Sequence, residues 1–198
     1  MIHLRVTTDF ARMQRILDDV SRQQLPFAAA RALTTVAKTA QREATDELPS
    51  AFDRPTPFTR RAVGVTSATK ATLEAVVFVR PIQAQYLGLA ETGGTQEPKK
   101  AALVTPVAQR LNQYGNIPNR ALARAKARKN VFVGQVRGVG GFWQRTKDGL
   151  KLLARFDASR KVAKNAWFIP AVTRVVERDF GRALREALAD ALRTARRR

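Results

Sequence analysis

The chain has 198 residues, with 36 Lys and Arg against 16 Asp and Glu and a formal net charge of +20 at pH 7. This excess is far from the near-balance of an ordinary soluble enzyme and indicates a negatively charged partner. Because 44% of the residues are hydrophobic, the chain can form a core, which excludes a disordered basic tail.

The sequence contains no cysteine, which excludes disulfides, thiolate metal sites and cysteine nucleophiles and fits assembly in a reducing cytoplasm. The first residues, MIHLRVTTDF, lack the apolar stretch of a signal peptide. The longest run without Asp, Glu, Lys or Arg covers residues 81–90, about half of the roughly 20 residues that a membrane helix needs. We therefore expect no membrane partner.

Apolar residues at three-to-four spacing predict two helices near the N-terminus. The first helix has Thr8 as its cap and runs to about Val20. Pro26 suits the first position of the second helix, which we expect to run to about Leu48 with an alanine-rich face for close packing. Three prolines within residues 49–59 predict a connecting loop, because proline disrupts helices and central strands.

Runs of β-branched residues predict strands in the middle of the chain. The runs lie at residues 62–66, 72–79, 131–136, 141–146 and 150–156. The first two form one hairpin, and Asp148-Gly149 is a strong hairpin signal between the last two. Before the later strands comes a basic segment, residues 116–130, which can be helical after Pro118.

The stretch from Pro170 is the clearest helix of the chain. At about 100° per residue, its apolar residues fall on one side and its arginines on the other. The apolar residues are Val172, Val176, Phe180, Ala183, Leu184, Ala187 and Ala191, and the arginines are Arg174, Arg178, Arg182, Arg185 and Arg193. These elements predict an α+β fold in a single domain, residues 1–198, with N-terminal and C-terminal helices packed on a small antiparallel sheet and a basic inserted arm at about 99–130.

The residues that enzymes use are scarce. His3 is the only histidine and lies at the chain end, where no cleft surrounds it. Glu43, Asp46 and Glu47 lie among Arg and Lys, so we interpret them as solvated ion pairs rather than as ligands for a metal ion. The glycines at 138–141 lack the context of a nucleotide-binding loop. We predict a protein that is not an enzyme and has no cofactor or metal.

Two groups of cations are candidate contacts for phosphates or for an acidic partner. They are Arg120, Arg124, Lys126, Arg128 and Lys129, and Arg174, Arg178 and Arg182. Steps of four place several of them on one helix face, which can follow a phosphate backbone, although a solvated helix face is the alternative. Phe142, Trp143 and Trp167 lie inside apolar runs and are expected in the core rather than stacked on bases. Contact would be mainly to phosphates.

Two local patterns point to a family. The stretch YLGLAETGGT has an aromatic, apolar and acidic turn before Gly-Thr, and WFIPAVTRVVERDF has an aromatic-apolar-Pro-Ala start to the final helix. With the order of helices and hairpins from about Phe10 to Leu192, they resemble the tail-completion proteins of tailed phages, of the minor tail protein Z type. The basic insert departs from compact members of that group. Candidate residues for assembly or for the fold of the turn are Tyr86, Leu87, Glu91, Gly93, Gly94, Trp167, Phe168 and Pro170.

The resemblance implies a structural virion protein that acts late in tail assembly, at the head-proximal end where the tail meets the neck. It implies a ring of copies, hexameric, around the DNA channel. The implied partners are tail terminator, tail tube or neck proteins, with genomic DNA or a tape-measure protein in the channel, after assembly in the host cytoplasm. The composition leaves open a free nucleic-acid-binding protein without sequence specificity. A cryptic nuclease or phosphotransferase is disfavoured, because no carboxylate cluster is visible.

Overall fold

The computed structural model describes residues 3–7, 19–99 and 101–195 and divides the chain into two compact units. Unit 1 is formed by Met1–Thr92 and Asn165–Arg198, and unit 2 by Gly93–Lys164. This division differs from the sequence-based prediction of a single domain with a basic insert at about 99–130. The interrupting segment is longer, because the strands near its two ends pair with each other and enclose the basic insert.

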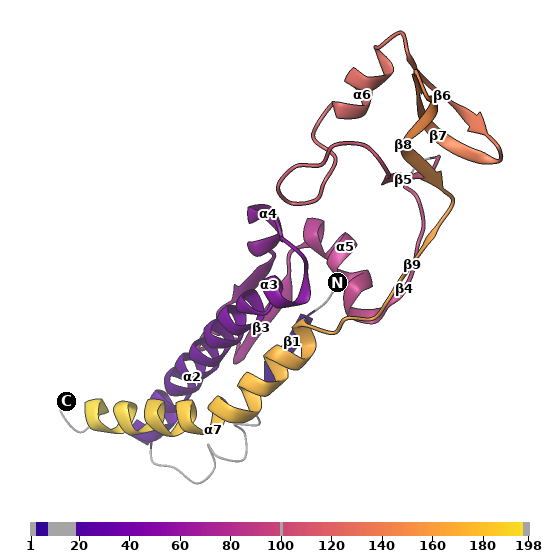
Figure 1. Ribbon diagram of the computed structural model, residues 1–198. Coiled ribbons are helices and arrows are strands. Elements are labelled where there is room, and N and C mark those ends of the chain that lie inside the picture. Colours follow the sequence, from indigo (N-terminus) through magenta and orange to yellow (C-terminus); the bar gives the residue numbers. More distant parts are fainter. Residues whose placement is uncertain (1–2, 8–18, 100, 196–198) are drawn as a thin grey trace. The chain divides into compact units, whose positions relative to one another are not determined.

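Unit 1 contains a three-stranded antiparallel sheet and two long helices (Figure 1). The strands lie in the order β1 (His3–Thr7), β3 (Glu74–Val79) and β2 (Val63–Thr66). The helices are α2 (Asp19–Asp46), α3 (Leu48–Ala51), α4 (Pro57–Arg60), α5 (Pro81–Thr92) and α7 (Phe168–Ala195). The α+β class is therefore confirmed.

The core of unit 1 lies where α2, α7 and the sheet meet. Its buried residues include Leu33 and Val36 of α2, Val77 of β3 and Val172 of α7. A second cluster consists of small residues, with Ala28 and Ala32 of α2 against Ala187 and Ala191 of α7. Alanine has a short side chain, so these helices can approach closely, which is the packing that the alanine-rich face predicts.

One prediction about the N-terminal half is wrong in detail. Pro26 is the eighth residue of α2 rather than its first, because α2 begins at Asp19. A proline there cannot donate a helical hydrogen bond, and burial of the neighbouring Leu25 and Ala28 stabilises the helix in its place. The helix predicted from Thr8 to about Val20 lies largely outside the described residues.

The predicted loop over residues 49–59 contains two single-turn helices, α3 and α4. Proline is compatible with a first helical turn, where its missing N–H has no partner to lose. Pro57 is the first residue of α4, and the Thr56 hydroxyl accepts a hydrogen bond from the backbone N–H of Thr59 at 3.1 Å. Pro57 therefore begins a helix, and Pro49 lies in the first turn of α3 rather than excluding it.

Unit 2 contains a four-stranded antiparallel sheet, a two-stranded sheet and one short helix. The larger sheet has the order β5 (Leu103–Pro106), β8 (Gly149–Asp157), β7 (Val139–Thr146) and β6 (Val131–Val136). The smaller one pairs β4 (Gly94–Gln96) with β9 (Arg160–Val162), and the helix is α6 (Ala121–Lys126). The predicted strands at 131–136, 141–146 and 150–156 are confirmed, and Gly149 occupies the predicted turn with φ 123°.

Candidate functional site

The carboxylate of Glu91, near the end of α5, accepts hydrogen bonds from the backbone N–H groups at the start of α7. Its Oε2 accepts hydrogen bonds from the N–H groups of Trp167 and Phe168, both at 2.9 Å, and its Oε1 accepts one from Ile169 at 3.0 Å. The first N–H groups of a helix have no partner within the helix, and a negative charge there also suits the helix dipole. Glu91 is 5% exposed, so water cannot readily replace these bonds.

Further contacts fix the chain around Glu91. The backbone N–H of Asn165 donates to the carbonyl of Ala90 at 2.7 Å, and the Asn165 side chain donates to the carbonyl of Ala51 at 2.7 Å. The ring of Trp167 contacts Phe52 and Phe168 edge to face, with centroid distances of 5.9 and 5.6 Å. The start of α7 is thereby held on the ends of α3 and α5.

Half of the predicted assembly residues are buried and maintain the fold. Leu87, Glu91, Trp167 and Phe168 are buried at this junction, so they offer no surface to another subunit. Sequence patterns could not predict this junction, because the Glu91 carboxylate binds backbone N–H groups that begin 76 residues further along the chain.

The remaining predicted residues are either exposed to solvent or are glycines in a backbone conformation that favours glycine. Tyr86 is 42% exposed, and its hydroxyl shares a hydrogen bond with the Thr59 hydroxyl at 3.1 Å. Pro170 is exposed in the first turn of α7. Gly93 and Gly94 have φ values of 72° and 138°, which favour glycine. Tyr86 and Pro170 therefore remain the candidates for contact with another subunit.

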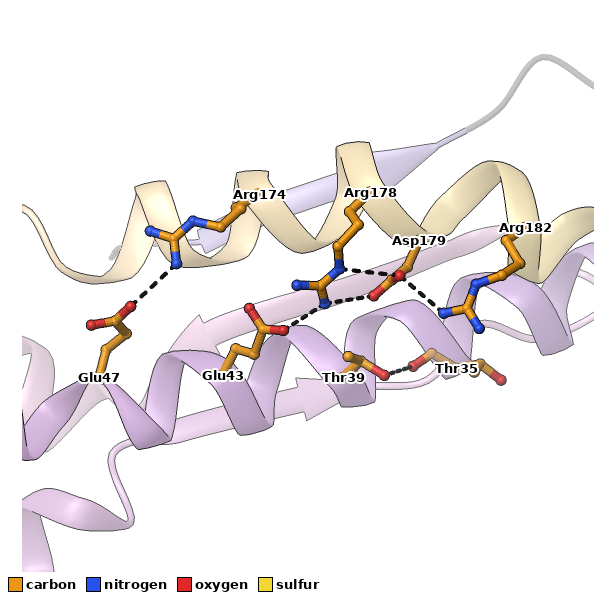
Figure 2. A network of polar contacts seen from close by, with 8 residues as sticks. All are labelled: Thr35, Thr39, Glu43, Glu47, Arg174, Arg178, Asp179 and Arg182. Carbon is orange, nitrogen blue, oxygen red and sulfur yellow. Dashed lines mark hydrogen bonds and ion pairs between the residues drawn. The ribbon is translucent and has the colours of Figure 1, made fainter.

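Three arginines of α7, Arg174, Arg178 and Arg182, are paired with carboxylates of the same unit (Figure 2). Arg174 contacts Glu47 of α2 at 3.3 Å, and Arg178 contacts Glu43 of α2 at 2.5 Å. The third carboxylate belongs to Asp179, which accepts from Arg178 at 2.8 Å and from Arg182 at 3.0 Å. The arginine side chains remain half exposed, but three carboxylates balance their charge. The sequence-based view of Arg174, Arg178 and Arg182 as a free cationic stripe is therefore corrected, whereas the solvated ion pairs expected of Glu43 and Glu47 are present.

The cations of residues 120–129 are exposed, and within the described residues no carboxylate pairs with them. They do not form a stripe on one helix, as the spacing of four predicts. Helix α6 has only six residues, Arg120 precedes it with φ 60°, and Arg128 follows its end. The chain turns there into β6, where the N–H of Val131 donates to the carbonyl of Arg128 at 3.0 Å.

The charge of the protein is concentrated in unit 2. Residues 93–164 contain 16 Lys and Arg but only three Asp and Glu, an excess of 13 out of the chain's 20. One of the three carboxylates, Asp157, is already bound by Arg155 at 2.6 Å and by the Thr105 hydroxyl at 2.6 Å. Unit 2 is therefore a strongly cationic body with little internal compensation.

The aromatic side chains of the unit 2 sheet lie on both of its faces. Phe142 packs against the buried cluster of Ala125, Val131 and Leu153, as expected for a core residue. Trp143 is half-buried on the opposite face, because neighbouring strand residues alternate. Beside it Phe132 is paired in register, and the Arg145 guanidinium lies 4.5 Å from the centre of the Phe132 ring.

A groove of about 460 Å³ lies in unit 1 beside the turn between β2 and β3. The cations Arg31, Lys38 and Lys70 line it together with Phe27. Arg31 is paired with Asp190 at 3.1 Å, and Lys70 lies 5.4 Å from the centre of the Phe27 ring. The groove can thus receive an acidic side chain, but two of its cations already have partners.

Among the described residues, no helix is both long and apolar enough to cross a membrane. The same part of the chain contains no group of three His, Cys, Asp or Glu that could hold a metal ion. The sequence matches no protein-family model, and no curated protein or solved structure matches it. The function must therefore be argued from the geometry described above.

Replacing Glu91 with Gln should destabilise unit 1, because the amide keeps one acceptor oxygen but turns an NH₂ group toward backbone donors. We expect the free energy of unfolding to fall by about 2 kcal/mol, the typical worth of a charged hydrogen bond with the helix dipole added. Urea denaturation measures the change. The matched control is Glu97→Gln at an exposed site, which should change stability by less than about 0.5 kcal/mol. Equal losses in both variants would contradict the role of Glu91.

Acid should weaken the ion pairs of Asp179 with Arg178 and Arg182 within α7. Hydrogen bonds from Arg178 and Arg182 lower the pKa of Asp179 from 3.8 to about 2. Because the pKa is lower in the folded state, the stabilisation is complete above pH 3.8 and is lost as the pH falls toward 2. Asp179→Asn should remove this part of the pH dependence, measured as urea midpoints across that range, whereas Asp148→Asn in an exposed turn should retain it. A wild-type pH profile in Asp179→Asn would refute the assignment.

Proposed function

We propose that this protein is a structural component of a phage virion, of the tail-completion type, which closes the head-proximal end of the tail and helps to join it to the neck. One observation supports the proposal above the others. The two stretches that carry the resemblance, YLGLAETGGT and WFIPAVTRVVERDF, meet through the three hydrogen bonds of Glu91. They are parts of a single structural junction, as two parts of one family pattern should be.

In the proposed assembly, unit 1 is the scaffold of each copy in a hexameric ring. Its charges are better compensated than those of unit 2, with 20 Lys and Arg against 13 Asp and Glu, and its long helices pack through small and apolar side chains. The exposed Tyr86 and Pro170 are available for contact with tail terminator, tail tube or neck proteins. This role is architectural, and we propose no catalysis and no cofactor.

Unit 2 supplies the contact with a negative partner. Copies that each carry 13 uncompensated charges in this unit would repel one another in a ring unless an anion lay between them. Genomic DNA in the channel is the proposed anion, with an acidic tail or tape-measure protein as the alternative. Purified tails and virions should contain the protein in ring stoichiometry, measured by quantitative mass spectrometry.

A second candidate function is that of a free nucleic-acid-binding protein without sequence specificity. The concentration of charge in unit 2 favours it as much as it favours the virion role, because phosphate contacts alone give affinity without sequence preference. Absence of the protein from purified particles, together with retained DNA binding, would support this second function and exclude the first.

A variant of the basic segment tests whether it contacts a partner. Replacing Arg120, Arg124, Lys126, Arg128 and Lys129 with Gln should leave unit 2 folded, because these side chains are exposed and exposed charges contribute little to stability. Each lost phosphate contact should reduce the slope of log affinity against log salt by about 0.9, equally for unrelated DNA sequences. Titrations at several salt concentrations measure the slope.

The outcome also identifies the partner. If the variant binds DNA normally but no longer joins particles, the segment contacts an acidic protein. If both DNA binding and incorporation are unchanged, the segment is a solvated arm and has no role in the proposed function.

A further inference from the structure

Within the described residues, every residue other than glycine that has a positive φ is an arginine. These are Arg54, Arg120 and Arg137, with φ values of 46°, 60° and 48°. The left-handed conformation brings the Cβ atom of an L-residue too close to the following carbonyl, so it is disfavoured for most side chains. Glycine avoids the contact, and Asn or Asp tolerates it best. Arginine has no such advantage.

Arg137 shows the mismatch most clearly. It lies with Gly138 between the paired residues Val136 and Val139, in the two-residue turn that joins β6 to β7. Both turn residues have positive φ, 48° and 80°, which is the conformation of a type I′ turn. Asn-Gly is the preferred sequence for this turn. An arginine in the first position gives the hairpin no conformational benefit.

The three arginines differ in what their guanidinium groups contact. Arg54 pairs with its neighbour Asp53, with Nη2 and Oδ2 separated by 2.9 Å. Arg120 and Arg137 are exposed, and neither has an ion-pair partner among the described residues. Both belong to unit 2, with its three carboxylates among 16 cations. Nothing in the described fold therefore compensates for the strain at these two positions.

We infer that Arg120 and Arg137 are contacts to the phosphates of duplex DNA. Backbone strain that the fold does not require is typical of functional positions. The planar guanidinium group matches phosphate geometry and stays charged at any relevant pH. Unit 2 offers cations on α6, on the hairpin turn and on the strands rather than in one spot, and this distribution suits a continuous polyanion better than a local acidic patch. The inference names the partner of unit 2 and so rests on the proposed function.

The inference makes stability and affinity change in opposite directions. Asparagine at both positions relieves the strain, so the Arg120→Asn, Arg137→Asn double variant of the full chain should melt at least about 2 °C higher than the wild type. The same variant loses two phosphate contacts. Its slope of log affinity against log salt should therefore fall by about 1.8, for a random-sequence duplex and for a second, unrelated duplex alike. At 0.1 M salt this amounts to roughly eightfold weaker binding per arginine.

Two control variants separate charge from strain. Arg54→Asn relieves the same strain in unit 1 but removes an arginine that is already paired, so the affinity for DNA should not change. Arg120→Lys, Arg137→Lys keeps both charges in the strained conformation, so it should retain most of the salt slope without a gain in melting temperature. Fluorescence anisotropy and thermal denaturation of the same samples measure both quantities.

The outcomes distinguish this inference from the proposed function. A lower melting temperature of the Asn double variant, or an unchanged salt slope, would overturn the inference. If the variant binds DNA like the wild type but fails to join particles, the partner is an acidic protein, so the inference is wrong and the virion role survives. The predicted loss of DNA affinity in a protein absent from virions would confirm the inference and refute the virion role.

Discussion

The hydrogen bonds between the Glu91 carboxylate and the first N–H groups of α7 determine where the two parts of unit 1 join. A helix that starts in a buried place needs partners for these groups, and one carboxylate provides three of them together with a favourable charge. From that point α7 packs Val172 and Val175 into the core. Unit 2 is inserted between the end of α5 and the start of α7. The junction therefore stabilises unit 1 regardless of the sequence of unit 2.

The distribution of carboxylates divides the protein into a moderately cationic unit and a strongly cationic one. In unit 1, Glu43 and Glu47 of α2 and Asp179 of α7 face arginines of α7, which reduces the field of that helix (Figure 2). In unit 2, Ala125, Val131 and Leu153 form a small buried cluster, and 16 Lys and Arg outnumber three Asp and Glu. Stability and binding therefore depend on different residues, so the cations of unit 2 can change without loss of the fold.

Periodic patterns predicted the long elements well and the short or distant contacts poorly. The two faces of α7 and the strands at β6, β7 and β8 follow from local spacing, because the core covers one side of each element. Strands β1, β4 and β9 have five residues or fewer, and their partners lie far along the chain, so local spacing carries little signal for them. Glu91 could be named as a candidate, but its role could not, because its partner is backbone. The pairing of Arg178 with Glu43 likewise requires the packing of α2 on α7.

The two predicted cation stripes differ because the long helix α7 brings carboxylates to its arginines, whereas short helices and turns do not. A long amphipathic helix packs beside another helix, and carboxylates of either helix come within reach of its arginines, as Asp179 reaches Arg182 three residues away. A six-residue helix and a two-residue turn offer few such neighbours. Cations placed there stay unpaired within the fold even when the backbone is strained. The arginines best suited to an external anion are therefore Arg120 and Arg137, which lie outside regular helix, and of these the helical pattern did not single out Arg137.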